Sequence, residues 1–155
     1  MKLQFMREAI RLSRQKMRAN QGGPFGAIIV RDGKIVARGW NRVLATNDPT
    51  AHAEISAIRG ACKKLKRFHL HDCELYTSCE PCPMCLGAVY WARLKTVYYA
   101  NTRKDAAGIQ FDDSLIYDEV RLPLRHRKIP MKPLLRREAL KVFTEWKSKV
   151  DKVPY

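Results

Sequence analysis

The stretch Thr77–Cys85, TSCEPCPMC, constrains the fold most, because it combines three cysteines at every third position with two prolines. Proline lacks a backbone N–H and is tolerated only in the first turn of a helix. A helix through this stretch therefore cannot begin much before Glu80. Cys82 and Cys85 then lie on one face of its first turns, whereas Cys79 precedes the helix on extended chain.

The setting of these cysteines favours metal binding or free thiols over disulfides. The chain has five cysteines, an odd count, and its first residues, MKLQFMREAIRLSRQK, contain no continuous apolar region of the kind a secretory signal needs. A cytoplasmic location is therefore expected. No run approaches the roughly 18 apolar residues of a membrane span, so no membrane association is expected.

The cysteines lie where zinc chemistry is plausible. The free N–H groups and the dipole at a helix N-terminus lower the pKa of a thiol, and zinc binds the thiolate. Upstream, His52 offers an imidazole ligand, and Glu54 follows it by two residues in the same helix end. Three protein ligands, His52, Cys82 and Cys85, leave zinc one open position, as in catalytic sites. This H-x-E…P-C-x-x-C pattern is a known signature of zinc deaminases.

Two other interpretations of the cysteines stay open at this point. Cys79 could join the other three residues in a closed structural zinc site, although Glu54 would then have no role. Two of the cysteines could instead form a disulfide. Cys62 and Cys73 sit where small buried residues are expected, and no role is assigned to them.

The remaining sequence predicts an α/β protein in one domain, residues 1–155. Asp32-Gly33 between two apolar stretches is a strong hairpin signal, and Asp48-Pro49 reads as an N-cap followed by the first helical residue. The alternation of strands and helices favours a sheet with helices on both faces. Helices are predicted over 3–19, from 49 to about 65, over 82–93, near 113–120 and along a final amphipathic stripe, and strands over 25–30, 34–40, 73–77, 96–100 and 131–135.

The charge leaves open a nucleic-acid partner. The chain has 30 Lys and Arg against 15 Asp and Glu, a net charge of +15. Much of this charge lies in residues 121–155, whereas residues 72–85 carry acidic and no basic side chains. A solvated basic face is the simpler interpretation, so nucleic acid is not favoured, but the charge does not exclude it.

At these motifs the sequence resembles the cytidine-deaminase-like superfamily, and within it the bacterial guanine deaminases. The matching stretches are GGPFGAIIV, NDPTAHAEISAIR, LYTSCEPCPMCLGAVYWAR, FDDSLIY and the terminal VPY after Trp146. They follow one another along nearly the whole chain. The first two and most of the third are also similar to tRNA adenosine deaminases. The basic stretch RLPLRHRKIPMKPLLRR exceeds what a small neutral purine requires, and here the chain departs from the family.

The resemblance implies a three-layer α/β/α fold with a mixed central sheet of about five strands. It also implies a homodimer whose C-terminal segment, about 136–155, crosses to the partner subunit. In such an enzyme Zn²⁺ binds to His52, Cys82 and Cys85, and Glu54 carries protons during the hydrolysis of guanine to xanthine and ammonia, a step of purine catabolism.

The resemblance further implies purine contacts from Asn41 and Asp113. It adds stacking by Phe25 and closure of the pocket by Tyr155. The residues themselves leave simpler roles open. Asn41 could belong to a turn and Asp113 could cap the helix that follows it. Phe25 could be a core side chain, and Tyr155 a frayed chain end.

Three alternatives to guanine deamination remain at this stage. The substrate could be a guanosine-like nucleoside or another aminopurine. The enzyme could deaminate adenosine in tRNA, which the charge supports. Finally, the chain could be a zinc-stabilised RNA-binding module without catalytic activity.

Overall fold

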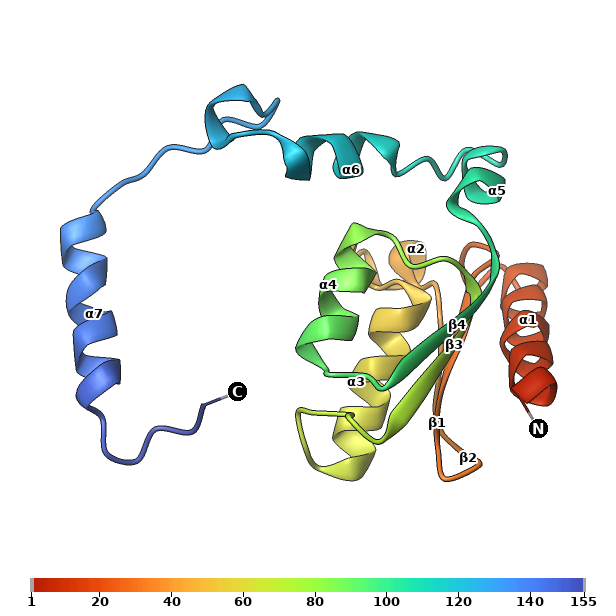
Figure 1. The fold of residues 1–155 in the computed structure, drawn as a ribbon. Helices are drawn as coiled ribbons and strands as arrows, with labels where there is room; N and C mark the ends of the chain where they lie inside the picture. Colours follow the sequence, from red (N-terminus) through yellow and green to blue (C-terminus); the bar gives the residue numbers. More distant parts are fainter. Residues whose placement is uncertain (1, 155) are drawn as a thin grey trace. The chain divides into compact units, whose positions relative to one another are not determined.

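The computed structural model describes residues 2–154 and divides the chain into two compact units, Met1–Ser114 and Leu115–Tyr155. The first unit carries the sheet and most of the helices (Figure 1). Its helices are α1 Lys2–Arg18, α2 Val43–Thr46, α3 Ala53–Leu65, α4 Pro83–Trp91 and α5 Arg103–Ala107. Its strands are β1 Gly26–Arg31, β2 Lys34–Trp40, β3 Cys73–Cys79 and β4 Thr96–Asn101.

The four strands form one mixed sheet in the order β2-β1-β3-β4. β1 is antiparallel to both β2 and β3, whereas β3 and β4 are parallel. The tight turn between β1 and β2 is made by Asp32 and Gly33, which both have positive φ, 48° and 70°. This is the backbone conformation that a two-residue Asp-Gly hairpin requires, so the predicted hairpin is confirmed.

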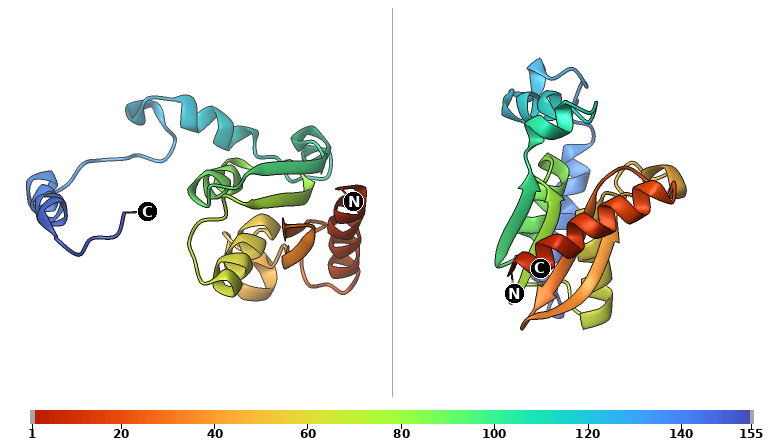
Figure 2. Two further views of the ribbon diagram at one scale, coloured as in Figure 1. Left: turned by 60° about the horizontal axis from the view of Figure 1, so that its bottom comes forward. Right: turned by 90° about the vertical axis from the view of Figure 1, so that its right-hand side faces the viewer.

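Helices cover both faces of the sheet, which confirms the three-layer α/β/α architecture. α1 packs on one face, while α3 and α4 lie on the other (Figures 1 and 2). Alternation along β1 divides its side chains between these layers. Ile28 and Val30 pack with Ala9 and Leu12 of α1. Ala27 and Ile29 belong to the second core cluster, which also contains Ala53, Ala57, Ile58, Ala61, Leu70, Cys73, Leu75, Val89 and Ala92.

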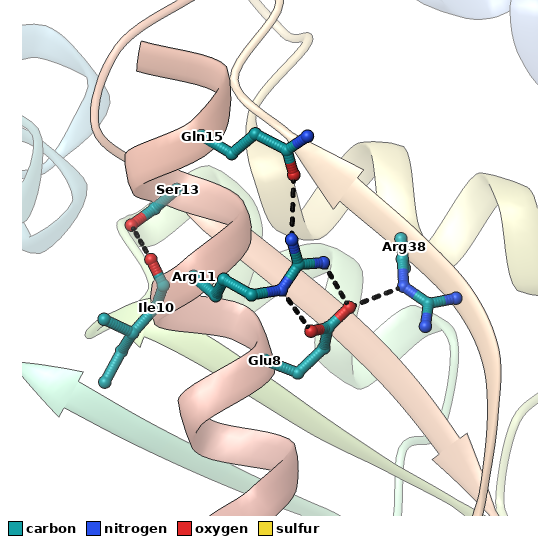
Figure 3. A network of polar contacts seen from close by, with 6 residues as sticks. All are labelled: Glu8, Ile10, Arg11, Ser13, Gln15 and Arg38. Atoms are coloured by element: carbon teal, nitrogen blue, oxygen red, sulfur yellow. Dashed lines mark hydrogen bonds and ion pairs between the residues drawn. The ribbon is translucent and has the colours of Figure 1, made fainter. Parts of the chain in front are cut away.

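α1 is also tied to the sheet by a polar network on the surface (Figure 3). The Glu8 carboxylate accepts hydrogen bonds from Arg11 Nε at 2.7 Å and from Arg38 Nε of β2 at 2.8 Å. The hydrogen bond from Arg11, supported by the one from Arg38, lowers the pKa of Glu8 to about 2. Glu8 is therefore ionised over the physiological range and links a helix to a strand.

The second unit contains the greater part of α6, Ser114–Arg121, a short 3₁₀ turn Leu124–His126, and α7, Arg136–Ser148. The sheet has four strands and not about five, because the predicted strand at 131–135 does not form. Pro130 and Pro133 remove backbone donors from this stretch, and Leu135 has a left-handed φ of 52°. Both features oppose strand pairing.

The described helices are too short or too polar to cross a membrane. The expectation of one domain with a C-terminal segment on the partner subunit stays a prediction.

Candidate active site

His52 lies immediately before α3, at its N-cap position, with extended backbone angles (φ −70°, ψ 163°). The helix was predicted to begin at Pro49, and that prediction is wrong by four residues. The Asp48 carboxylate accepts hydrogen bonds from the N–H and the hydroxyl of Thr50, at 2.8 and 2.7 Å. The backbone N–H groups of Ala51 and His52 then bond to the carbonyls of Asp48 and Thr50, which closes tight turns before the helix begins. His52 is left to project from the end of that turn.

Cys82 has the same position at the start of α4, again with extended backbone (φ −65°, ψ 168°). Pro83 is the first helical residue, which suits a residue without an N–H, and Cys85 follows in the first turn. β3 delivers the chain to this point and ends at Cys79. The prolines therefore set the helix start as the sequence indicated.

The structure brings His52, Cys82 and Cys85 together, with their ligand atoms all within 4.8 Å of one another. His52 Nδ1 lies 3.6 Å from the Cys82 sulfur and 3.5 Å from the Cys85 sulfur. A tetrahedral zinc with Zn–S of about 2.3 Å and Zn–N of about 2.0–2.1 Å separates such ligand atoms by about 3.6 Å. One nitrogen and two sulfurs at this spacing fit a zinc ion.

Cys79 points elsewhere. Its thiol donates to the backbone oxygen of Thr102 at 3.7 Å, and burial raises its pKa to about 11. Within residues 2–154, the only group of three or more metal-ligating side chains is His52, Cys82 and Cys85. The five cysteines are all free thiols. The geometry therefore favours neither the closed four-ligand site nor a disulfide.

Each of the three clustered side chains has a shifted pKa. A hydrogen bond from Cys85 lowers the pKa of the Cys82 thiol, and His52 adds to this effect. The same contact with Cys82, together with burial, raises the pKa of Cys85. The hydrogen bond with Cys82 raises the pKa of His52. Cys82, whose pKa is lowered, is thus the thiol that lies beside the His52 imidazole and hydrogen-bonds to Cys85.

Glu54 lies beside this cluster and is only 6% exposed. Its Oε2 accepts a hydrogen bond from Cys85 Sγ at 3.4 Å, and its Oε1 accepts one from Thr77 Oγ1 at 3.1 Å. Burial raises the pKa of Glu54 above its usual range. A carboxyl group that takes up a proton more readily than usual suits proton transfer near neutral pH.

Asn41 is buried, and its side chain is held by the backbone around it. Its Oδ1 accepts hydrogen bonds from the N–H groups of Gly23 and Val43, each at 3.4 Å. Asn41 is thus a loop-organising residue, as its simpler interpretation proposed. Because the amide is planar, its NH₂ group points away from these backbone donors and can donate to another acceptor.

Phe25, directly before β1, packs edge to face against Phe111, with ring centroids 4.9 Å apart. Gly23 lies against both rings, since a Cβ at this position would lie 3.4–3.5 Å from their nearest carbon atoms. Phe25 is only partly buried. It therefore has ring surface that the core does not cover, as a stacking role would require.

Asp113 lies within electrostatic reach of the cysteines, because the charge of Cys82 raises its pKa after the larger effect of burial. The capping role belongs to its neighbour. Asp112 Oδ1 accepts a hydrogen bond from the N–H of Ser114, the first residue of α6, at 2.9 Å. Asp113 itself is partly buried. The predicted lid residue, Tyr155, lies outside the described residues.

Sequence reasoning did not single out two residues of this region, Thr77 and Phe111. The signal that could have placed Thr77 is its position in the strand, because alternation puts its side chain on the same face of the sheet as Leu75, under α3. Its partner Glu54 lies 23 residues earlier, so no local pattern reveals the contact. Phe111 begins the FDDSLIY stretch, and a single phenylalanine before two acidic residues has no pattern that marks it as a site residue.

The chain has clear relatives among known proteins. The model of the cytidine and deoxycytidylate deaminase zinc-binding region matches residues 1–101. The guanine deaminase of Bacillus subtilis (strain 168) is 52% identical over 151 residues, which are 97% of each chain. A tRNA-specific adenosine deaminase of Buchnera aphidicola is 35% identical over 124 residues, 79% of each chain.

Solved structures give the same grouping. The X-ray structure of guanine deaminase from Bacillus subtilis matches with a TM-score of 0.96, over 98% of this chain and 97% of that one. A guanine deaminase structure from Nitrosomonas europaea matches with a TM-score of 0.67 and 37% identity, over 70% of this chain and 63% of that one. Similarity to the Bacillus protein extends through both compact units.

Proposed function

The chain belongs to the cytidine and deoxycytidylate deaminase zinc-binding family, and we propose that it is a zinc-dependent guanine deaminase, hydrolysing guanine to xanthine and ammonia. The observation that carries the proposal is the cluster of His52, Cys82 and Cys85 with the buried carboxylate of Glu54 beside it. The near full-length similarity to the Bacillus guanine deaminase supports the choice of substrate.

His52, Cys82 and Cys85 would hold the zinc ion through one nitrogen and two sulfurs. A zinc ion held there supplies a water nucleophile that loses its proton near neutral pH. Burial of Cys85 and Glu54 keeps bulk water away from this side of the cluster. In a site of low dielectric, each charge interaction is stronger than it would be in water.

Glu54 would carry the protons of the reaction. Its Oε2 faces the cluster and would accept the proton of the attacking water. The proton would pass to the ring nitrogen next to C2 of guanine, which makes C2 electrophilic. After the oxygen adds to C2, Glu54 would take the second proton of that oxygen and pass it to the amine. The bond between C2 and the amine nitrogen would then break, so that ammonia leaves and C2 keeps the oxygen as the carbonyl of xanthine. The raised pKa of Glu54 suits both the acceptance and the return of the proton.

Four residues would bind the purine. Asp113 would accept hydrogen bonds from the N–H edge of guanine, whereas the corresponding ring nitrogen of adenine offers only an acceptor. The Asn41 NH₂ group would donate to a purine acceptor, since its oxygen already binds the backbone of Gly23 and Val43. Phe25 would stack on the ring, and Tyr155 would close the pocket.

The enzyme would act in the cytoplasm as a homodimer, with the C-terminal segment, about 136–155, on the partner subunit. Two exposed apolar faces, one in each unit, support an interface. On α4, Tyr90 and Trp91 are 75% and 72% exposed. On α7, Phe143 and Trp146 are exposed along one stripe. Large aromatic side chains in such numbers mark interaction surfaces.

The direct test is an assay of ammonia release by the zinc-loaded chain with guanine, guanosine, adenine, 2,6-diaminopurine and tRNA. We expect release from guanine with xanthine as the second product. Faster ammonia release from guanosine than from guanine would change the assigned substrate from the free base to its nucleoside.

A tRNA substrate remains the principal competitor because of the net charge of +15. Binding to a polyanion falls steeply with salt, since each neutralised phosphate releases counterions. Guanine turnover should vary little between low and moderate salt. Tight, salt-sensitive tRNA binding coupled to inosine formation would contradict the guanine assignment.

A further inference from the structure

Thr77 lies near the end of β3, on the face of the sheet that α3 covers. Cys73 and Leu75, which precede it by four and two residues, belong to the core beneath α3. Thr77 is 1% exposed, and its hydroxyl donates to Glu54 Oε1 at 3.1 Å. A buried hydroxyl on a strand thus holds one oxygen of a carboxylate on a helix.

The other oxygen of Glu54 has a partner that zinc would remove. Oε2 accepts its hydrogen bond from the Cys85 thiol at 3.4 Å. A cysteine binds zinc as the thiolate, which has no proton to donate. In the zinc-loaded protein Cys85 therefore cannot hold Oε2, whereas the Thr77 hydroxyl keeps its proton.

From the buried contact between the Thr77 hydroxyl and Glu54 Oε1 we propose that Thr77 is a positioning residue for the deamination. It anchors Oε1, so that Oε2 faces the reacting atoms in the orientation proton transfer needs. The inference rests on the proposed function of Glu54. It gives the two oxygens of Glu54 different roles: Oε1 is held by Thr77 of β3, and Oε2 exchanges protons.

The residue type suits this work. A threonine side chain is stiff at χ1 because two heavy atoms branch from Cβ, so its hydroxyl direction is well defined. Valine has nearly the same shape but no donor, and serine keeps the donor without the methyl group. Thr77→Val and Thr77→Ser therefore separate the hydrogen bond from the packing.

The experiment compares the zinc-loaded wild type, Thr77→Val and Thr77→Ser in guanine turnover, zinc content and xanthine affinity by calorimetry. Thr77→Val should lower kcat by about 10- to 100-fold, the usual effect of losing a partner that orients an active-site group. KM, zinc content and xanthine affinity should stay near the wild-type values. Thr77→Ser should retain most of the wild-type kcat.

Ser13→Ala is the matched control. It removes a buried hydroxyl that bonds to the backbone oxygen of Ile10 on α1, and it should leave kcat unchanged.

Combining each Thr77 variant with Glu54→Gln separates positioning from general damage. If Thr77 acts through Glu54, Thr77→Val should add little to the rate loss of Glu54→Gln. A full additional loss, an unchanged kcat in Thr77→Val, or a Thr77→Ser enzyme slowed as much as Thr77→Val overturns the proposal. If Thr77→Val does not fold, Thr77→Ser decides alone, because a serine enzyme slowed tenfold contradicts the anchoring role.

Failure of the inference is distinguishable from failure of the proposed function. Wild-type turnover of guanine tests the function without any variant. If the wild type deaminates another purine instead, the same comparison is made with that purine, and Thr77 is judged on it. A wild type that releases ammonia from no substrate overturns both proposals.

Discussion

Cys79 and Cys82 are three residues apart, yet they face different partners. Cys79 donates to the backbone of Thr102, whereas Cys82 lies 3.6 Å from the His52 imidazole. The difference arises because Cys79 ends a strand and Cys82 begins a helix. Two thiols in one short motif therefore have separate surroundings: one contacts a backbone oxygen, and the other belongs to the cluster that fits a metal ion.

A metal assay of two cysteine variants tests this separation. The wild type should purify with about one zinc per chain, and Cys82→Ala should lose it, because one of three ligands is gone. Cys79→Ser should keep both zinc and activity, since its partner is a backbone oxygen. Loss of zinc from Cys79→Ser would restore the closed four-ligand site.

Glu54 is the second residue whose role can be tested alone. Glu54→Gln keeps the size of the side chain and an acceptor oxygen for the Thr77 hydroxyl, but its amide cannot exchange a proton. Turnover of guanine should fall by about two to four orders of magnitude, while zinc content and purine binding persist. Near-normal turnover measured by xanthine formation would remove Glu54 from the mechanism.

At the scale of single elements, local signals predicted well wherever they acted alone. Asp32-Gly33 gave the hairpin because both residues tolerate positive φ. The helix predicted from Asp48-Pro49 begins later because the backbone N–H groups of Ala51 and His52 bond to the carbonyls of Asp48 and Thr50 and close tight turns instead. The predicted strand at 131–135 failed because Pro133 interrupts it. A strand also needs a neighbouring strand to pair with, and the local sequence does not show whether one is present.

The candidate site shows the same division. The metal-ligand set of His52, Cys82 and Cys85 could be predicted from the sequence, because each residue lies at a helix start that a nearby turn or proline fixes. The hydrogen bond between Thr77 and Glu54 could not be predicted, since the two residues meet only when α3 packs on the sheet. The sequence offered Asp113 as a cap of the helix that follows it, but the residue that bonds to the N–H of Ser114 is Asp112.

The link between α1 and β2 gives a prediction in pH. The pKa of Glu8 is lowered to about 2 by Arg11 and Arg38, from an ordinary value of about 4.3. A lowered pKa stabilises the fold above the ordinary value, and this stabilisation is lost as the pH falls from about 4.3 towards 2. Glu8→Gln should therefore destabilise the protein by about 1 kcal/mol at pH 7.

Urea unfolding of both proteins between pH 2 and pH 7 measures this effect. The difference between wild type and Glu8→Gln should shrink through the window from pH 4.3 to 2. Glu145→Gln, at an exposed glutamate of α7, is the control and should change little at any pH. A constant difference across the range would assign the effect of Glu8 to packing instead of charge.

For the whole molecule, the open question is where the C-terminal segment lies. Deleting Val153–Tyr155 removes no zinc ligand and no residue of either core cluster, so zinc content and folding should persist. If the terminal tyrosine closes a purine pocket, guanine turnover should fall at least tenfold, which corresponds to about 1.4 kcal/mol.

Mixing the truncated chain with the Glu54→Gln chain shows which subunit the tail serves. In a mixed dimer with exchanged tails, the inactive chain would lend its intact end to the truncated chain's working site. Turnover should then partly recover on mixing. Full activity of the truncated chain alone would make the end of the chain dispensable.

The N-cap position of α3 also has a consequence for how this protein can evolve. His52 occupies that position but makes no capping hydrogen bond with its side chain. Asp, Ser or Asn there typically stabilises a helix by about 1 kcal/mol over a residue that does not cap it. Selection for heat resistance in a zinc-depleted host, with no demand for activity, should therefore enrich those residues at position 52, as sequencing of the survivors would show.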